Sequence, residues 1–310
     1  MKKISIIIPC YNEEENVFEV HKQVKKVLSS YEKYSHEIIF IDNASIDKTV
    51  QNIKEIINED RFTKLIVNSK NFGQSRSPFY AMLNAYGDAV ILMVADLQTP
   101  AETIHQFIKN WEQGHKIVLG RRRKNKISRL RKSMNWIYYK FMNLMSEDGH
   151  IDNFIGFGLY DKSIIDLFRN FNIGTPYLRG LINEIGFEKK LVDYSEPQRL
   201  NGKTKNNIFS LISIVLTGLV SHSKAPLRFM IYLGLISSII SLIIGICYLI
   251  LKLIYWDQFI IGLGPLVIGV YFIGSILLFS LGIVGEYIVS LINLVKNRPL
   301  VIEKERINFD

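Results

Sequence analysis

The chain has few cysteines and lacks the common phosphate-binding loops. Its 310 residues include two cysteines, Cys10 and Cys247, which are too few and too far apart for a disulfide framework or a zinc site. No G-x-G-x-x-G follows the first apolar run, and G-x-x-x-x-G-K-[ST] occurs nowhere. Dinucleotide-dependent dehydrogenases and P-loop ATPases rely on these glycine-rich cradles. The sequence therefore argues against both classes, and any phosphate must be held in another way.

Charge is missing from two long stretches in the last third of the chain. No charged residue lies between Arg228 and Lys252, or between Asp257 and Glu286. Each stretch is long enough to cross a hydrocarbon core of ~30 Å as a helix, so we predict two transmembrane helices. The alternative, two helices buried in a large soluble core, would need more protein mass than this chain contains.

Positive charge marks the outer ends of this predicted hairpin. By the positive-inside rule both ends face the cytoplasm, which predicts a multi-pass protein of the cytoplasmic (inner) membrane. The net charge of +9 gathers near residues 121–132 and the membrane ends rather than along a nucleic-acid-binding motif. We therefore expect a membrane surface as a partner and no nucleic acid. The flanking basic residues are Lys224, Arg228, Lys296, Arg298, Lys304 and Arg306.

The first part of the chain alternates apolar runs with helical patterns. Strands are predicted at 4–8, 37–41, 64–67 and 89–94, with helices at 16–28, 48–57 and 75–86 between them. Such a βαβ series forms a parallel sheet, in which ligands bind beyond the carboxyl ends of the strands. The turns at 11–13, 42–45, 68–73 and 96–98 are therefore expected to converge on one crevice.

The last of these turns carries two candidate metal ligands. A divalent cation that bridges a diphosphate to oxygen ligands is a common substitute for a glycine-rich cradle. Asp96 and Gln98 stand at alternate positions after the fourth predicted strand and can supply such oxygens. The competing interpretation is that Asp96 caps a helix near Pro100.

Several short motifs resemble a known family in their order and spacing. They are Ile-Ile-Ile-Pro-Cys-Tyr-Asn-Glu-Glu-Glu-Asn at 6–16, Ile-Asp-Asn-Ala-Ser-Ile-Asp-Lys-Thr at 41–49, Asn-Phe-Gly at 71–73 and Ala-Asp-Leu-Gln-Thr-Pro at 95–100, with further segments at 199–205, 226–228, 285–288 and 297–299. Together they resemble the family 2 glycosyltransferases, and in particular the polyprenyl-phosphate glycosyltransferases, bacterial relatives of dolichol-phosphate mannose synthase. The resemblance covers nearly the whole chain.

The resemblance implies a GT-A-type α/β fold: a Rossmann-like mixed, mainly parallel sheet, with two C-terminal transmembrane helices and interfacial helices. It divides the chain into a cytoplasmic glycosyltransferase domain at 1–206, a juxtamembrane interfacial helix at 207–228, a transmembrane hairpin at 229–292 and a cytoplasmic tail at 293–310. A second interfacial segment is expected at 134–142, where aromatic residues surround a lysine. For both interfacial segments the alternative is a core helix of the domain.

The implied activity is transfer of one sugar, with inversion, from a nucleotide diphosphate sugar to a polyprenyl phosphate lipid at the cytoplasmic face, for modification of cell-envelope glycans. UDP is the expected nucleotide and undecaprenyl phosphate the expected lipid; a homo-oligomer is left open. Two other interpretations remain. One is a catalytically impaired membrane scaffold or nucleotide-sugar sensor. The other is a polysaccharide synthase, although Gln198-Arg199 is not followed by the tryptophan of that group's Gln-x-x-Arg-Trp motif.

The resemblance also implies which residues act. For Glu13 the alternative is a first-turn helix acid, for Asp42 a turn or N-cap residue, and for Asp152 a loop cap. A nucleoside site is implied at Pro9, Tyr11, Glu13, Asp42, Asn71 and Gly73, and a Mg²⁺ or Mn²⁺ site at Asp96 and Gln98. Residues implied in catalysis and phosphate contacts are Asp96, Arg121, Arg129, Ser133, Asp152 and Arg199.

The chain departs from the family pattern at several positions. Asn43 and Ala44 stand in a turn that is usually Asp-Asp-Gly-Ser, and Val94 and Thr99 stand in a motif that is usually Asp-Ala-Asp-Leu-Gln-Asp. Gly156 occupies a position where many bacterial relatives have aspartate. With fewer carboxylates, a cation would depend more on the substrate phosphates. A lipid phosphate is already anionic at neutral pH, so orientation and leaving-group stabilisation matter more than a strong general base.

Overall fold

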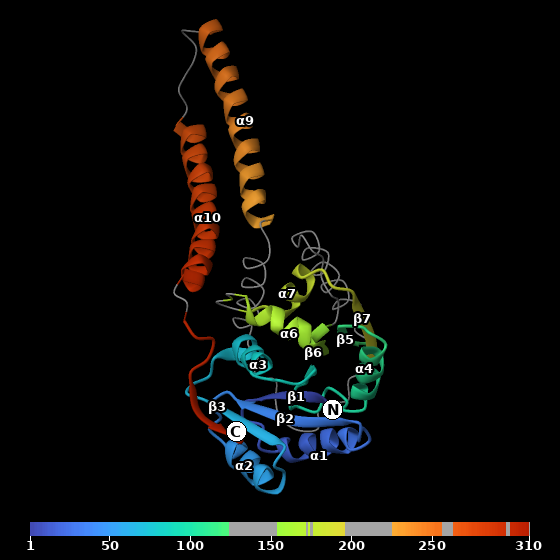
Figure 1. Ribbon diagram of the computed structural model, residues 1–310. Helices are drawn as coiled ribbons and strands as arrows, with labels where there is room; N and C mark the ends of the chain where they lie inside the picture. Colours follow the sequence, from blue (N-terminus) through green and yellow to red (C-terminus); the bar gives the residue numbers. More distant parts are fainter. Residues whose placement is uncertain are drawn as a thin grey trace.

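The computed structural model of the chain describes residues 1–123, 154–171, 173, 176–195, 225–255, 263–295 and 298–309. Figure 1 shows an α/β domain from which two long helices project. The predicted interfacial segment at 134–142 lies outside the described residues. Of the second, at 207–228, only 225–228 are described, as the start of helix α9.

The domain is built on a sheet of eight strands in the described part of the chain, in the order β7-β5-β6-β4-β1-β2-β3-β8. The neighbours β4, β1, β2 and β3 pair in parallel, whereas β6 and β8 run antiparallel to their neighbours. The expected mixed, mainly parallel sheet is therefore confirmed. The strands are β1 (Lys2–Cys10), β2 (Tyr34–Asp42), β3 (Thr63–Asn68), β4 (Ala89–Leu92), β5 (Ile117–Arg122), β6 (Phe154–Asp161), β7 (Lys189–Tyr194) and β8 (Glu303–Ile307).

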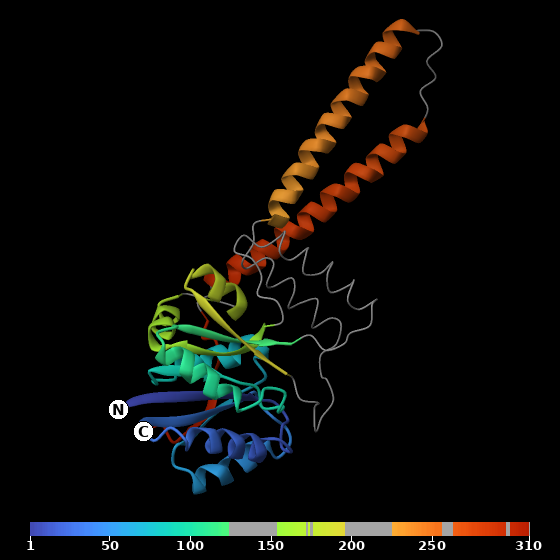
Figure 2. The same ribbon diagram turned by 90° about the vertical axis from the view of Figure 1, so that its right-hand side faces the viewer.

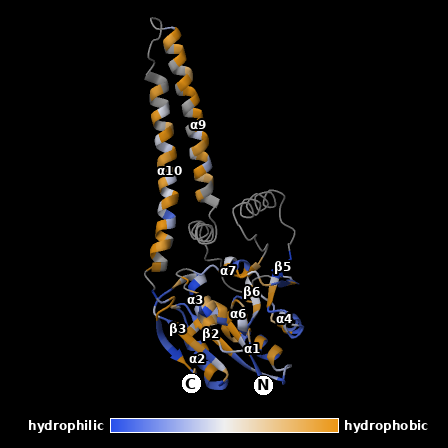
Figure 3. Ribbon diagram, turned by 45° about the horizontal axis from the view of Figure 1, so that its top comes forward, coloured by the Kyte–Doolittle hydropathy of each residue, from blue (hydrophilic) through white to orange (hydrophobic). Residues whose placement is uncertain are grey.

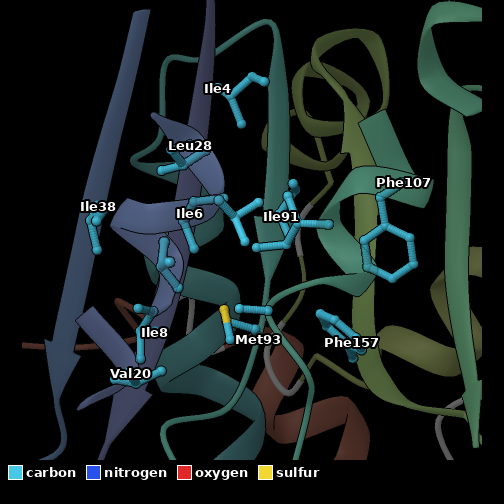
Figure 4. Packing of buried hydrophobic residues seen from close by; sticks show 14 of the residues in the cluster. Ile4, Ile6, Ile8, Val20, Leu28, Ile38, Ile91, Met93, Phe107 and Phe157 are labelled. Atoms are coloured by element: carbon cyan, nitrogen blue, oxygen red, sulfur yellow. The ribbon is translucent and has the colours of Figure 1, made fainter. Parts of the chain in front are cut away.

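Apolar side chains on both faces of the sheet bury it between two layers of helices. Side chains alternate along a strand, so in β1 Ile6 and Ile8 pack with Val20 and Phe107 on one face, while Ile7 packs on the other. Figure 4 shows the first of these two clusters. Helices α1 (Val17–Leu28), α2 (Thr49–Glu59) and α4 (Thr103–Glu112) contribute to the first cluster, and α3 (Gly73–Leu83), α6 (Lys162–Arg169) and α7 (Leu178–Glu184) to the second.

The strand directions bring several chain turns to one edge of the sheet. β5 and β7 are parallel to each other, and both run in the direction of β1 because β6 is antiparallel to β4 and to β5. The carboxyl ends of β1, β2, β3, β4, β5 and β7 therefore share an edge with the amino ends of β6 and β8. We call this the carboxyl edge.

Two long apolar helices, α9 (Ala225–Ile254) and α10 (Leu263–Val295), extend away from the domain (Figures 1 and 2). Hydrophobic residues cover both along most of their length (Figure 3), and Ser280 Oγ lies 3.4 Å from Met230 Sδ between them. Among the described residues, one helical window, Phe272–Val289 in α10, is long and apolar enough to cross a membrane, and none of it is buried within the protein. The predicted pair of spans stays a prediction.

After α10 the chain returns to the sheet. β8 pairs antiparallel with β3, and Ser69 N–H donates to the Ile302 carbonyl at 2.9 Å just before the paired residues. Lys54 Nζ contacts Glu305 Oε2 at 2.7 Å, which links β8 to α2. The segment expected to be a tail, 293–310, therefore contributes an edge strand to the domain, a role that hydropathy and charge did not predict.

Candidate active site

The turns after β1 and β2 are locked together by hydrogen bonds at the carboxyl edge. Asn12 N–H donates to Ser45 Oγ at 2.8 Å, and Ile46 N–H donates to Asn12 Oδ1 at 2.9 Å. Asn12 adopts φ of +53°, a left-handed conformation that asparagine tolerates better than most residues. Lys48 N–H also donates to Glu14 Oε2 at 2.9 Å. The two turns therefore form one preorganised rim.

Glu13 has a local role in this rim. Its N–H donates to Thr49 Oγ1 at 2.8 Å, and its carboxylate accepts from Asn16 Nδ2 at 2.6 Å. The Glu13 carbonyl accepts from the N–H groups of Asn16 and Val17, where α1 begins. Helix α1 begins at Val17 with Glu19 as its first-turn acid, so Glu13 precedes the helix and its interpretation as a first-turn acid is wrong. Its contact with a nucleoside stays a prediction.

Asp42 closes the turn after β2. The residue has no exposed surface, and its carboxylate accepts from Ser45 N–H at 2.9 Å and from the Ser45 hydroxyl. Burial raises the pKa of Asp42, while the hydrogen bonds from Ser45 oppose that rise. Between them lies Ala44 at φ of +62°, where the family pattern has glycine. Asp42 therefore shapes the turn, and its direct contact with a ligand stays a prediction.

Asn43 ties the turn after β2 to the turn after β3. Its Nδ2 donates to Asn71 Oδ1 at 2.9 Å and to the Gly73 carbonyl at 3.3 Å. Its Oδ1 accepts from Phe72 N–H at 2.8 Å and from Asn68 Nδ2 at 3.1 Å. A carboxylate at this position could accept but not donate. Asparagine thus has a structural reason to stand where the family pattern has aspartate.

The Asp96–Gln98 turn exposes polar groups around a buried anchor. Leu97 is 9% exposed and adopts φ of +61°, a strained conformation for a bulky residue. Asp96 Oδ1 accepts from Gln98 N–H at 3.1 Å, and both flanking residues are half-buried. Helix α4 has Glu102 as its N-cap residue, so the interpretation of Asp96 as a helix cap is wrong. The sequence near Pro100 did not show where the helix begins, and the structure places its first residue at Thr103.

The donor set at this turn fits a cation that arrives with a phosphate ligand. Within the described ranges, no three His, Cys, Asp or Glu residues are grouped closely enough to hold a metal by themselves. Asp96 and Gln98 nevertheless offer one carboxylate and one amide oxygen. Mg²⁺ commonly binds through one or two carboxylates together with substrate phosphates and water. Asp96 and Gln98 are thus chemically suited to such a shared site.

Arg121 lies on the same edge, at the end of β5. Its Nε and Nη2 contact Asp193 Oδ1 and Oδ2 at 2.6 and 3.1 Å. At the end of β1, Pro9 is half-buried, and Tyr11 just beyond it is 36% exposed. The remaining predicted catalytic residues lie outside the described residues: Arg129, Ser133, Asp152 and Arg199.

The structure brings the described site residues to one edge of the sheet, as the strand pattern predicted. It also assigns roles to residues that sequence reasoning missed. Asn43 and Asn68 were included only as members of the predicted turns, and Asp193 was not considered. A polar residue at the end of an apolar run was the available signal for Asn68 and Asp193. The residues gathered at the edge are Pro9, Tyr11, Glu13, Asp42, Asn71, Gly73, Asp96, Gln98 and Arg121.

Proteins with similar sequences carry glycosyltransferase names. The chain is 34% identical over 302 residues to CsbB of Bacillus subtilis, whose name classes it as a glycosyltransferase, with 97% of this chain and 91% of that protein covered. It is 31% identical over 305 residues to the bactoprenol glucosyl transferase of Shigella phage SfII, with 98% of each protein covered.

A solved structure shares the fold. Glucosyl-3-phosphoglycerate synthase from Mycobacterium tuberculosis, determined with Mn²⁺, UDP-glucose and phosphoglyceric acid, superposes with a TM-score of 0.53 at 14% identity, covering 71% of this chain and 79% of that one. Residues 5–168 match the family described as Glycosyl transferase family 2. The chain therefore belongs to glycosyl transferase family 2 and is a glycosyltransferase with the GT-A fold.

Proposed function

We propose that this glycosyltransferase moves one sugar from a nucleotide diphosphate sugar to a polyprenyl phosphate at the cytoplasmic face of a membrane. Two observations carry the proposal: the turns of the candidate site meet at the carboxyl edge, and two long apolar helices, α9 and α10, extend from the same domain. The full-length similarity to bactoprenol glucosyl transferases, at 98% coverage of each protein, supports a lipid acceptor.

The donor is proposed to be a UDP-sugar that binds across the interlocked turns. The exposed ring of Tyr11 offers a stacking face for a base, and Pro9 precedes it on the same strand end. Asp42 and Asn43 hold the turns in place, so that binding needs little reordering of the loop. Asn71 and Gly73 complete this rim from the start of α3.

Asp96 and Gln98 are proposed to hold Mg²⁺ or Mn²⁺ together with the donor diphosphate. A bound cation neutralises negative charge that develops on the departing nucleoside diphosphate. The bound Mn²⁺ in the M. tuberculosis structure supports this choice of metal at the level of the fold.

The reaction is proposed to be a single displacement. An oxygen of the lipid phosphate attacks the anomeric carbon, the bond from that carbon to the diphosphate breaks, and the configuration inverts. Arg121, with Arg129, Ser133 and Arg199, would bind the anionic acceptor and hold it in line with the departing group. Asp152 is proposed to contribute orientation, because an ionised phosphate has no proton to remove.

The membrane arrangement is part of the same proposal. α9 and α10 would cross the bilayer as a hairpin with both ends in the cytoplasm, and the segments at 134–142 and 207–228 would lie along the inner leaflet. This places the carboxyl edge where a polyprenyl phosphate headgroup is accessible from the cytoplasm.

The test is transfer by the detergent-purified full chain from a panel of UDP-, GDP- and CMP-sugars to undecaprenyl phosphate, with Mg²⁺ or Mn²⁺ against EDTA. We expect a lipid-linked sugar whose formation EDTA abolishes. Asp96→Ala should remove activity without unfolding the protein. The matched control is Glu102→Ala, because Glu102 is an exposed carboxylate a few residues away whose side chain makes no capping hydrogen bond. Full activity in Asp96→Ala would reject the metal assignment, and silence across the panel would favour a scaffold or sensor.

A further inference from the structure

Arg121 is held by a partner that the catalytic residue set does not include. β5 and β7 pair in parallel, and Arg121 and Asp193 are directly opposite each other in that register. The contact is bidentate, with Nε to Oδ1 at 2.6 Å and Nη2 to Oδ2 at 3.1 Å. This side-on geometry fixes the plane of the guanidinium relative to Asp193. Hydrogen bonding from Arg121 lowers the pKa of Asp193.

A backbone irregularity in the β5–β6 pairing lies beside Arg121. The β5–β6 register shifts between Leu119 and Arg121: their partners on β6 are Gly158 and Phe154, so the extra residues lie on β6. A Cβ on Gly120 would lie 2.8 Å from Phe157 Cδ1 and 3.2 Å from the Phe157 carbonyl oxygen, so only glycine allows β6 this close. Bulges of this kind bend the strand that carries them and are common beside active sites.

The strand pairing continues past the ion pair and stabilises it. Arg123 N–H donates to the Tyr194 carbonyl at 2.9 Å, two residues beyond Arg121 and one beyond Asp193. The Tyr194 ring packs edge-on against Phe157, with centroids 5.4 Å apart. Asp193 is therefore anchored by buried neighbours, although its own side chain is exposed.

The exposure of this pair argues against a role in stability alone. Arg121 and Asp193 side chains are 43% and 38% exposed, and an ion pair in that setting adds little to the free energy of unfolding. Its larger effect is conformational, because a side-on carboxylate selects one orientation of a long, flexible arginine.

We propose that Asp193 is a positioning residue that fixes the orientation of the Arg121 guanidinium at the carboxyl edge, where Arg121 contacts the phosphate of the lipid acceptor. The proposal rests on the proposed transfer to a polyprenyl phosphate. Ordering one rotamer-rich side chain before binding corresponds to an affinity gain of about three- to tenfold. Asp193 also cancels the charge of Arg121, which alone would weaken phosphate binding. The direction of the measured change therefore tells which effect dominates.

The experiment measures KM separately for undecaprenyl phosphate and for the nucleotide sugar, using the full chain in detergent. Asp193→Asn should raise KM for the lipid about three- to tenfold and leave KM for the donor unchanged, and Asp193→Glu should restore part of the loss. In an Arg121→Ala background, Asp193→Asn should have no further effect, because there is no guanidinium to orient. The matched control is Asp166→Asn, which breaks the Asp166–Arg169 ion pair on α6 and should change neither KM.

Three results would overturn the proposal. An unchanged or lower KM for the lipid in Asp193→Asn would show that charge cancellation dominates or that the pair is only structural. A further loss in the Arg121→Ala background would show that Asp193 acts through another group.

Direct binding of undecaprenyl phosphate, measured without donor, separates this proposal from the proposed function. If the wild type binds the lipid but does not transfer sugar, and Asp193→Asn weakens that binding, the function fails and the positioning role stands. If the wild type does not bind the lipid, both fail.

Discussion

At the residue scale, several polar side chains of the candidate site form hydrogen bonds within the protein. These bonds hold the turns of the site in place. Asn12 and Asn43 form hydrogen bonds with neighbouring turns, and Asp42 forms them within its own turn. Such preorganisation lowers the entropic cost of binding. It also makes the site sensitive to small changes in these residues.

Ala44 has a left-handed backbone conformation that is unfavourable for alanine. It adopts φ of +62°, where an L-residue with a Cβ is disfavoured. We expect Ala44→Gly to raise the free energy of unfolding by about 0.5 to 1 kcal/mol, after allowing for the greater freedom of glycine in the unfolded chain. Thermal unfolding of the full chain in detergent would measure it. Gly114→Ala is the reverse control, because Gly114 has φ of +98° with no atom within 4 Å of an added Cβ, and it should lower stability. A lower melting temperature for Ala44→Gly would contradict the strain argument.

Asn43→Asp would restore the usual acidic residue of the family at a cost in structure. The new carboxylate would face the Asn71 Oδ1 and Gly73 carbonyl oxygens with no proton to donate. We expect a loss of about 1–3 kcal/mol in unfolding free energy, the range for an unsatisfied buried polar group. Thermal unfolding and the Mn²⁺ dependence of transfer would be measured together. If the variant is as stable as the wild type and needs a lower Mn²⁺ concentration for transfer, this prediction is wrong, and an aspartate at position 43 contributes to metal binding.

At the element scale, a buried carboxylate joins three strands at the opposite edge of the sheet. Glu37 of β2 is 3% exposed and contacts Lys3 of β1 at 2.7 Å and Lys64 of β3 at 2.9 Å. Ser5 Oγ also donates to it at 2.6 Å. Burial alone raises the pKa of Glu37, but hydrogen bonds from Lys3, Ser5 and Lys64 outweigh it, and the net pKa is lowered.

This depressed pKa predicts acid sensitivity. Because the folded state favours the ionised form, Glu37 contributes stability that is fully present above its unfolded pKa of about 4.3 and is lost as the pH falls through the folded value. Glu37→Gln should lower the unfolding free energy at pH 7 by about 3 kcal/mol, by leaving two lysines without a buried counter-charge. It should also flatten the loss of stability below pH of about 4.3. Unfolding measured at neutral and acid pH would check both.

The control is Glu112→Gln, which removes a more exposed carboxylate bound to Lys33 and should lower the unfolding free energy by under about 1 kcal/mol. Equal losses for the two variants would contradict the role of burial.

β8 is the other element whose placement matters. Its alternating charges, Glu303, Lys304, Glu305 and Arg306, cover the β3 edge with a strand that is itself unattractive for further pairing. Because β8 follows α10, the same strand ties the last apolar helix to the sheet close to the carboxyl edge.

At the scale of the whole molecule, the proposed hairpin makes a prediction about sidedness. In a Cys10→Ala, Cys247→Ala background, Glu15→Cys and Arg298→Cys would report on the two ends, and Asp257→Cys on the connection between the apolar stretches. In right-side-out vesicles we expect a membrane-impermeant maleimide to label Asp257→Cys only, because two spans place both ends inside. Inverted vesicles should give the opposite pattern. Labelling of Glu15→Cys and Asp257→Cys from the same side would rule out the first span.

Much of this molecule was predictable because the signals are local. Continuous apolar runs identified β1 to β4, since a strand covered on both faces needs apolar residues throughout. Parallel strands bring their carboxyl ends to one edge, which located the turns of the site before any coordinates. Strand β8 gave no such signal, because five mostly charged residues pair only when an existing edge is available.

The sequence by itself determined the sheet type, the family and the two charge-free stretches, because hydrophobic periodicity, motif order and the lack of charge can each be read along one segment. The tertiary structure alone decided which side chains meet. Asn43 contacts a residue 28 positions away, and Arg121 pairs with one 72 positions away. Such pairs depend on strand register and on the path of the loops. Neither segment alone therefore carries a sequence pattern from which the pair can be predicted. They nevertheless determine where the site presents its charges.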